Sequence, residues 1–206
     1  MSRNAVDHLK SDPVMVALID RAGPIKLSPR RLSPFESLTR AIIHQQLSGH
    51  AATTILGRFC ALFSGDGFPI PVSVLKTSPE RLRSAGLSRA KASYICDIAQ
   101  RTVDGLIPSL DECDQMTDAE IITKLTEIKG VGRWTAEMLL IFNLGRPDVL
   151  PIHDLGVRKG FQSAYRKRKL PEPEQLSRYG LRWAPYRTAA AWYLWRAADF
   201  LNGKDW

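Results

Sequence analysis

Asp154 is the residue whose type and setting point most directly to chemistry, because it follows the loop 145–153 and precedes the helical stretch 155–158. Its carboxylate is expected at a helix N-terminus, where the helix dipole favours negative charge. A carboxylate held there can stabilise positive charge that develops on a bound substrate, and it can orient a water molecule. The alternative is that Asp154 acts only as an N-cap, the ordinary role of an aspartate in this setting.

The stretch 125–136 is a candidate anion site, because Gly130-Val131-Gly132 joins two predicted helices. Glycine readily adopts positive φ, so successive N–H groups can point outward at the start of the second helix. An anion such as a phosphate fits against such a helix N-terminus. The alternative is a helix C-cap followed by an ordinary tight turn.

Two further features could belong to a site or to the core. Aromatic residues are dense towards the end of a chain that has only 8% of them overall, namely Trp134, Tyr186, Trp192 and Trp195. Each of them is either a site residue or an ordinary core residue. The turn Gln45-Gln46-Leu47-Ser48 separates two predicted helices, and the alternative for it is a capped helix start with Leu47 facing the core.

Taken together, these features resemble the helix-hairpin-helix (HhH-GPD) DNA glycosylase superfamily, and most closely its DNA-3-methyladenine glycosylase II family. The similarity covers roughly residues 34–195. Its four motifs stand in the family's order, as Gln45-Gln46-Leu47-Ser48, the hairpin 125–136, Leu150-Pro151-Ile152-His153-Asp154-Leu155 and Arg182-Trp183-Ala184-Pro185-Tyr186-Arg187.

The resemblance aligns Asp154 with the family's catalytic aspartate. Cleaving a base from deoxyribose builds positive charge on the sugar, and an adjacent ionised carboxylate both stabilises that charge and can orient a water. An alkylated purine already carries positive charge and departs without protonation, so one carboxylate suffices. His153 points in another direction at the helix start, and we interpret it as a DNA-facing or structural residue with at most a minor part in assisting water.

The resemblance also implies a base pocket and a wedge. It places Trp134 and Trp195 against the extracted base, and an indole face attracts a cationic base. Tyr186 and Met138 complete the predicted pocket; some relatives carry an aromatic residue at the position of Met138, which leaves the range of bases open. The wedge that fills the gap left by the base is Gln46, with Leu47 as the alternative.

For the hairpin, the resemblance implies contact with a DNA phosphate and with a monovalent cation. The phosphate is expected at Gly130, Val131, Gly132 and Arg133, where peptide dipoles anchor the duplex without sensing base identity. A structural Na⁺ or K⁺ is expected on the backbone carbonyls of Thr126, Ile128 and Val131. The sequence itself shows no metal ligand.

Trp134 stands where relatives that also cut the DNA strand carry a lysine that forms a Schiff base. The sequence therefore predicts a monofunctional glycosylase that excises alkylated purines, 3-methyladenine and 7-methylguanine, in base excision repair and leaves an intact abasic site. Two alternatives stay open: a glycosylase for oxidised or mismatched bases, and a non-catalytic paralogue that binds lesions in DNA.

Composition supports a polyanionic partner. The 29 Lys and Arg residues exceed the 21 Asp and Glu residues, and the segment 158–169 holds six basic residues and no acid. The alternative for that segment is a solvated helix face. We expect a monomer that binds double-stranded DNA carrying alkylated bases, in the cytoplasm of a bacterium at its nucleoid or in a eukaryotic nucleus, with no membrane contact.

Cysteine usage bears on the cofactors. Cys60, Cys96 and Cys113 are odd in number and widely spaced, so they indicate reduced thiols rather than disulfides or a zinc site. The four-cysteine spacing of an iron–sulfur cluster is missing as well. We expect no required cofactor and no iron–sulfur cluster.

Apolar periodicity and start and stop signals predict eight or nine helices and no strand. Capping residues place helix starts at Ser33-Pro34-Phe35-Glu36, Ser78-Pro79-Glu80, Ser88 and Thr117-Asp118-Ala119-Glu120. Further helices are expected after Ser48 towards Phe63, from Gly132 to Leu144, after Asp154, around 174–179 and from Pro185 to Leu201. The stretch 64–71 is expected to be a loop, and prolines 69, 71, 108 and 147 are interpreted as loop markers.

The fold class that follows is all-α, with two interleaved helical lobes, a helix-hairpin-helix at about 118–144 and a cleft between the lobes. The whole chain, 1–206, is expected to be a single glycosylase unit. Larger members of the family add an N-terminal sheet domain, and residues 1–33 are too few to form one.

Overall fold

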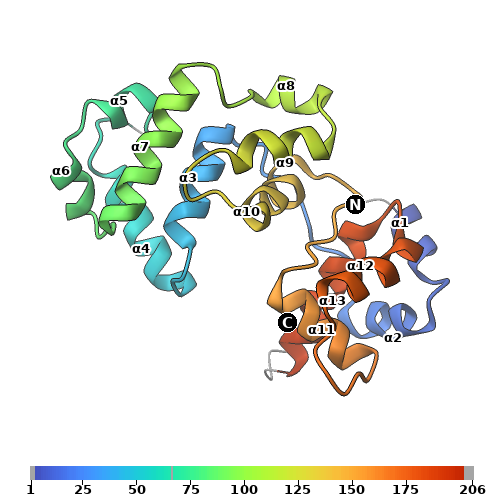
Figure 1. Ribbon diagram of the computed structural model, residues 1–206. Coiled ribbons are helices and arrows are strands. Elements are labelled where there is room, and N and C mark those ends of the chain that lie inside the picture. Colours follow the sequence, from blue (N-terminus) through green and yellow to red (C-terminus); the bar gives the residue numbers. More distant parts are fainter. Residues whose placement is uncertain (1–2, 66, 202–206) are drawn as a thin grey trace. The chain divides into compact units, whose positions relative to one another are not determined.

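The computed structural model describes residues 3–65 and 67–201, and every regular element in those ranges is a helix (Figure 1). The chain forms two compact units, one of residues 1–29 and 140–206 and the other of residues 30–139. The first unit is therefore built from both ends of the chain. This confirms the all-α class with two interleaved lobes, whereas the cleft and the action of 1–206 as one unit stay predictions.

The unit 30–139 contains α3 (Pro34–His44), α4 (Gly49–Cys60), α5 (Pro71–Leu75), α6 (Pro79–Ser84), α7 (Arg89–Val103), α8 (Leu110–Gln115), α9 (Asp118–Thr126) and α10 (Arg133–Met138). Helix α7 packs against α3, α5 and α6, and its Ile95 and Ile98 are fully buried. Helix α7 is therefore the central helix of this unit.

Short polar motifs begin most of these helices. Ser33, Ser48, Ser78 and Ser88 each accept a hydrogen bond from the backbone N–H three residues on. Complete capping boxes begin α8 (Ser109 with Glu112) and α9 (Thr117 with Glu120). The hydrogen bonds from Ser109 and Thr117 hold the pKa of the Glu112 and Glu120 carboxyls below the usual value. Local sequence thus fixes where these helices start.

The unit of residues 1–29 and 140–206 contains α1 (Arg3–Leu9), α2 (Pro13–Ala22), α11 (Leu155–Ala164), α12 (Pro173–Gly180), the 3₁₀-helix η2 (Leu181–Trp183) and α13 (Arg187–Leu201). Helix α13 packs against α11, α2 and α1. Its Ala189, Ala190, Ala191, Tyr193 and Leu194 are all fully buried. A helix that is buried on successive residues in this way lies at the centre of its unit.

Asp12 joins the N-terminal segment to the rest of that unit. Its Oδ1 caps α2 by accepting from Val14 N, and its Oδ2 accepts from the Tyr165 hydroxyl at 2.7 Å and from Trp183 Nε1 at 3.2 Å. Asp12 is 5% exposed, so these neutral donors satisfy a buried carboxylate. Burial, and then the bond to Asp12, raises the pKa of the Tyr165 hydroxyl well above its ordinary value.

The predicted helices are all present, but the structure contains more helices than were predicted. All nine predicted helices are present, but the described residues also form α1, α2, α5 and α8, so the predicted count was wrong. Pro71 begins α5 rather than marking a loop, because proline suits the first turn of a helix. Asp66, within the predicted loop 64–71, lies outside the described residues.

Two predicted boundaries also differ. The helix expected over 132–144 is α10 followed directly by the π-helix η1 (Leu139–Leu144), and the last helix begins at Arg187 rather than Pro185. Within the described part of the chain, no helix is long and apolar enough to cross a membrane.

Candidate functional site

Asp154 is the N-cap of α11, as its place in the sequence predicted. Its Oδ1 accepts a hydrogen bond from Val157 N at 2.8 Å, and the same oxygen accepts one from the Trp195 indole Nε1 at 2.9 Å. Asp154 is partly exposed to solvent. The N-cap interpretation and the functional one are therefore compatible, because the capping bond orients a carboxylate that substrate could still approach.

Close packing of α11 against α13 brings Trp195 to Asp154. A Cβ on Gly160 would collide with the Leu194 carbonyl oxygen, so only glycine permits this approach. One turn earlier, a Cβ on Gly156 would lie 3.1 Å from Asp154 Oδ1 and 3.0 Å from Trp195 Cδ1. The Trp195 ring also stacks on Phe142, with centroids 5.5 Å apart and planes at 28°. Trp195 is thus held both through its N–H and through its ring face.

The loop that leads to Asp154 is tied to the start of α13. Arg187 Nε and Nη2 donate to Asp148 Oδ1 and Oδ2 at 2.7 and 2.8 Å, a two-point ion pair. The fully buried Thr188 hydroxyl donates to Arg146 O at 2.7 Å and accepts from Val149 N at 2.9 Å. These contacts limit the freedom of the loop 145–153, and the sequence analysis predicted none of them.

The remaining predicted residues of this unit have separate surroundings. His153 is exposed, which agrees with a surface residue. The Tyr186 ring meets the His8 ring edge to face, with centroids 5.5 Å apart. Trp192 is 7% exposed and packs as a core residue, which is the alternative that the sequence left open for it. The placement of Tyr186 in a base pocket stays a prediction.

In the other unit, the predicted hairpin connects α9 to α10. Gly130 has φ +82°, the left-handed conformation that glycine accepts readily. Val131 is buried, and its N–H donates to Ile128 O at 3.0 Å. Gly132 is the N-cap of α10 and has no side chain to cap it, and Gly132, Arg133 and Trp134 are exposed in succession. The exposed backbone of the hairpin therefore lies at 132–134.

Arg133 is oriented by a buried carboxylate. Its Nε donates to Glu137 Oε1 at 2.9 Å; the Glu137 side chain is 2% exposed, whereas that of Arg133 is 58% exposed. The guanidinium has five N–H donors, so this bond leaves others directed at solvent. Glu137 was not predicted, although its spacing of four residues from Arg133 is the pattern of a helical ion pair.

Residues 46–48 of the turn 45–48 are exposed, and Gln45 is half-buried. Gln46 has φ +57°, unusual for a residue other than glycine, and Leu47 is 39% exposed, so Leu47 does not face the core. Ser48 caps α4. Two contacts of this turn were not predicted from sequence: Lys91 Nζ donates to backbone carbonyls at its start, and the Gln45 amide donates to Gly130 O.

Trp134 and Met138 lie one turn apart on α10, in the unit that carries the hairpin. Trp134 is 43% exposed and Met138 is half-buried. Exposure of a large indole is compatible with a ligand contact. The prediction that both face a base held near Asp154 is not tested by the geometry of their own unit.

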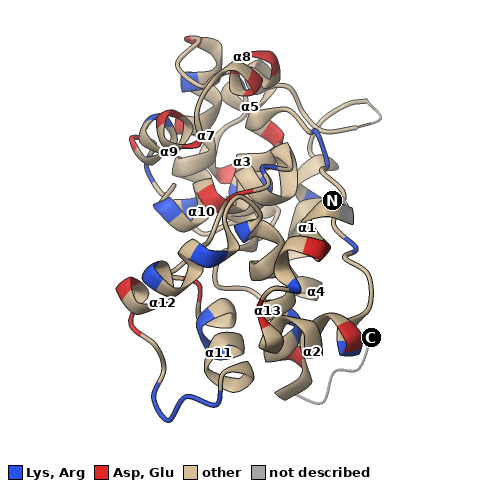
Figure 2. Ribbon diagram, turned by 90° about the vertical axis from the view of Figure 1, so that its right-hand side faces the viewer, with Lys and Arg blue, Asp and Glu red and all other residues tan. Residues whose placement is uncertain are grey.

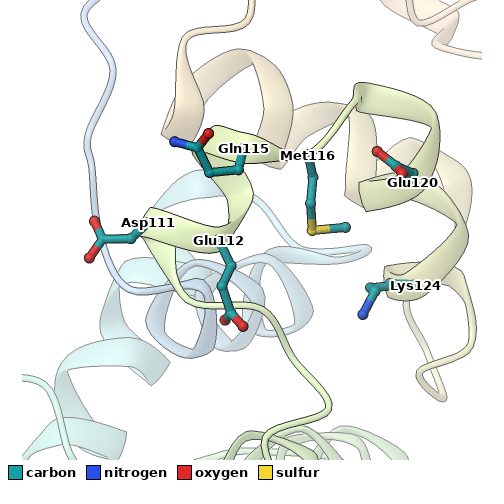
Figure 3. A pocket seen from close by; sticks show the side chains of 6 residues that line it. All are labelled: Asp111, Glu112, Gln115, Met116, Glu120 and Lys124. Atoms are coloured by element: carbon teal, nitrogen blue, oxygen red, sulfur yellow. The ribbon is translucent and has the colours of Figure 1, made fainter.

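A surface hollow on α8 and α9 is lined by none of the predicted residues (Figure 3). Its lining is Asp111, Glu112, Gln115, Met116, Glu120 and Lys124. Three carboxylates around one lysine repel a polyanion. This face of the unit is therefore unsuited to a nucleic-acid backbone.

The described residues offer no cluster of metal ligands and no activated thiol. They contain no group of three or more His, Cys, Asp or Glu side chains that could hold a metal ion. Cys60, Cys96 and Cys113 are not joined in disulfides, and burial raises the pKa of Cys60 and Cys96. A raised pKa lowers the thiolate fraction and with it the reactivity of both residues.

Comparison with known proteins identifies the family. Residues 39–185 match the model of the HhH-GPD superfamily base excision DNA repair protein, so both the hairpin and Asp154 lie inside the match. The chain belongs to the HhH-GPD superfamily, as its sequence motifs indicated.

Particular relatives are similar over nearly the whole chain. DNA-3-methyladenine glycosylase 1 of Schizosaccharomyces pombe is 40% identical, over 91% of this chain and 82% of its own length. The solved structure of S. pombe 3-methyladenine DNA glycosylase (Mag1) in complex with abasic DNA is 39% identical, with a TM-score of 0.86 over 94% of this chain and 95% of that one. DNA-3-methyladenine glycosidase from Bacillus halodurans gives 36% identity and a TM-score of 0.87 over 98% and 92%.

Proposed function

We propose that this chain is a monofunctional DNA glycosylase that excises alkylated purines, 3-methyladenine and 7-methylguanine, from double-stranded DNA in base excision repair. The observation that carries the proposal is the Asp154 carboxylate, held at the start of α11 by Val157 N and Trp195 Nε1. The relatives described above are named as 3-methyladenine glycosylases or glycosidases, which supports the substrate class.

The chemistry follows from the position of Asp154. As the bond between base and deoxyribose lengthens, positive charge develops on the sugar, and a fixed carboxylate stabilises it. A water molecule oriented by the same carboxylate adds to the sugar carbon and gives up a proton to that carboxylate or to solvent, and the electron pair of the broken bond leaves with the base. A cationic alkylated purine departs as a neutral molecule. The products are a free base and an abasic site.

Binding and extrusion are assigned to the other predicted residues. The exposed hairpin residues Gly132 and Arg133 hold a DNA phosphate, next to Gly130 and Val131, which shape the turn. Gln46 enters the duplex as the wedge, with Leu47 beside it. Trp134, Met138, Trp195 and Tyr186 contact the extracted base, and Trp134 in place of a lysine leaves no amine there to form a Schiff base.

The hairpin carbonyls of Thr126, Ile128 and Val131 are proposed to hold Na⁺ or K⁺. Ile128 O accepts one hydrogen bond, from Val131 N, and a carbonyl oxygen has a second lone pair for a cation. The cation would add positive charge beside the phosphate. We propose no other cofactor and no iron–sulfur cluster, and a monomer that acts where genomic DNA lies, in a nucleoid or nucleus.

The test is to incubate the protein with methylated duplex DNA and measure released bases and abasic sites. Asp154→Asn should keep its affinity for DNA and lose turnover by about 10²–10⁴, the range of a positioned acid-base group. Asp20→Asn makes the same change at an exposed position of α2 and should act like the wild type. Unchanged turnover in Asp154→Asn would move catalysis to another residue.

The non-catalytic alternative predicts a different result in the same assay. A lesion-binding paralogue would bind methylated DNA and release none of several alkylated bases. Release of oxidised or mismatched bases in place of alkylated ones would identify the other alternative.

A further inference from the structure

We propose that α7 is a common support for the hairpin and the wedge turn 45–48, and that Lys91 is the positioning residue that holds Gln46 ready to enter the duplex. The role of the turn 45–48 as a DNA wedge rests on the proposed function. The contacts all lie within the unit 30–139.

Lys91 fastens the start of the turn. Its Nζ donates to Ile43 O at 2.9 Å and to Gln45 O at 2.8 Å. Helix α3 ends at His44, so both carbonyls belong to the last turn of a helix, where the intrahelical donors run out. The ammonium also complements the negative end of the helix dipole. Burial lowers the pKa of Lys91, as expected for an ammonium partly removed from water.

The residue that follows has a backbone conformation that needs such support. Gln46 has φ +57°, a region in which the side chain crowds the backbone. Strained positions of this kind persist only where their neighbours over-determine them. Lys91 fixes Gln45 on one side, and Ser48, the N-cap of α4, fixes the other. Gln46 is therefore presented at the tip of a turn whose two ends are anchored.

Gln45 connects this turn to the hairpin. Its Nε2 donates to Gly130 O at 3.0 Å and lies 3.4 Å from Thr135 Oγ1, which accepts. The contact joins residues 85 positions apart in the chain. The backbone of one predicted DNA-contact element thus accepts a hydrogen bond from the side chain of the other.

The same face of α7 supports the hairpin. Tyr94 lies directly under Gly130, where a Cβ would be 2.7 Å from the Tyr94 Cγ, and Asp97 Oδ2 accepts from Lys129 N at 3.4 Å. Lys91, Tyr94 and Asp97 are spaced by three residues, which places them along one side of the helix. One helix face therefore contacts the wedge turn and the hairpin in succession.

This arrangement has a consequence for base extrusion. A phosphate held at the hairpin and a side chain pushed into the base stack are parts of one support, so the free energy of phosphate binding can drive the wedge into the duplex. If the turn 45–48 were flexible, the base would stay stacked in the duplex while the protein still bound the DNA backbone. Lys91 should then matter for extrusion and little for binding undamaged DNA.

The test compares Lys91→Met, which keeps an unbranched apolar stem and removes the ammonium, with Lys76→Met, the same change at an exposed position of the unit. In Lys91→Met, extrusion followed with a fluorescent base analogue and single-turnover base release should both fall at least about tenfold, as expected for hydrogen bonds to a charged group. Affinity for undamaged duplex and the melting temperature should stay near those of Lys76→Met. Amide hydrogen exchange at 45–48 should accelerate.

The exchange measurement separates this proposal from the proposed function. If the wild type releases no base, the glycosylase assignment fails, and exchange at 45–48 still decides whether Lys91 holds the turn. Unchanged exchange in Lys91→Met, or equal losses of extrusion and of binding to undamaged duplex, would overturn the proposal. Should Lys91→Met not fold, Gln45→Ala removes the contact with Gly130 O and must also lower extrusion more than binding.

Discussion

At the scale of single residues, Trp195 has two separate duties. Its ring stacks on Phe142 and is proposed to meet the extracted base, while its N–H donates to the Asp154 oxygen that also caps α11. A carboxylate that stabilises a short-lived cation works best when its donors are already in place, because no reorganisation is then needed during the reaction. The indole N–H is such a donor.

Trp195→Phe separates the two duties, because phenylalanine keeps an aromatic face and loses the N–H. We expect single-turnover base release to fall by about 10- to 100-fold, the equivalent of roughly 1.5–3 kcal/mol for a hydrogen bond to a charged group. Affinity for an abasic-site duplex should change little. Trp195→Ala, which loses the face as well, should be slower still. A Phe variant as fast as the wild type would show that the bond to Asp154 is structural only.

Residue contacts differ in how far the sequence could predict them. The Asp154 cap was predictable because it joins residues three apart, and the Arg133–Glu137 pair, four apart, also has a local pattern in the sequence. The Asp154–Trp195 bond spans 41 residues, and the Lys91 contact with Gln45 spans 46. Contacts at such separations depend on how helices pack, and local periodicity holds no information about that.

At the scale of elements, the same distinction explains the helices that were missed. Helices α2 and α8 have start signals in the sequence, the Asp12 cap before Pro13 and the Ser109–Glu112 capping box. Helices α1 and α5, with seven and five residues, are too short to show a period. Stretches of that length are helical because they pack against the rest of their unit, which agrees with the cost of nucleating an isolated helix.

The contact between α11 and α13 offers a matched pair of substitutions. Gly156→Ala places a Cβ 3.1 Å from Asp154 Oδ1 and 3.0 Å from Trp195 Cδ1, so it should disturb the pair directly. A small displacement of a catalytic group is costly, and we expect base release to fall about tenfold. The melting temperature should hold, because alanine favours helix over glycine by roughly 1 kcal/mol.

Gly160→Ala, in contrast, should lower the melting temperature. Its Cβ would meet the rigid Leu194 backbone, so α11 and α13 must separate, at a cost of about 1–3 kcal/mol for an overpacked core. Thermal denaturation and single-turnover assays of the two variants check the contrast. Equal losses of stability in both would mean that Gly156 serves packing rather than the Asp154–Trp195 pair.

At the scale of the whole molecule, the net charge of +8 is unevenly distributed. The loop between α11 and α12 carries Arg166, Lys167, Arg168 and Lys169, all exposed, and Figure 2 shows this connection as a continuous blue stretch. Of the six residues that line the surface hollow on α8 and α9, three are acidic and one is a lysine. A duplex bound by its backbone would approach the first region and avoid the second.

The salt dependence of DNA binding tests this charge distribution when the same substitution, lysine to glutamine, is made separately at two positions. Each phosphate neutralised contributes a slope of about −0.9 in a plot of log affinity against log salt concentration, because a condensed counterion is released. If Lys167 contacts a phosphate, Lys167→Gln should make the slope shallower by about 0.9 and weaken binding to methylated and unmethylated duplex alike. Lys124→Gln, beside Glu112 and Glu120, should leave the slope unchanged. Equal slopes for both variants would place the duplex away from the loop between α11 and α12.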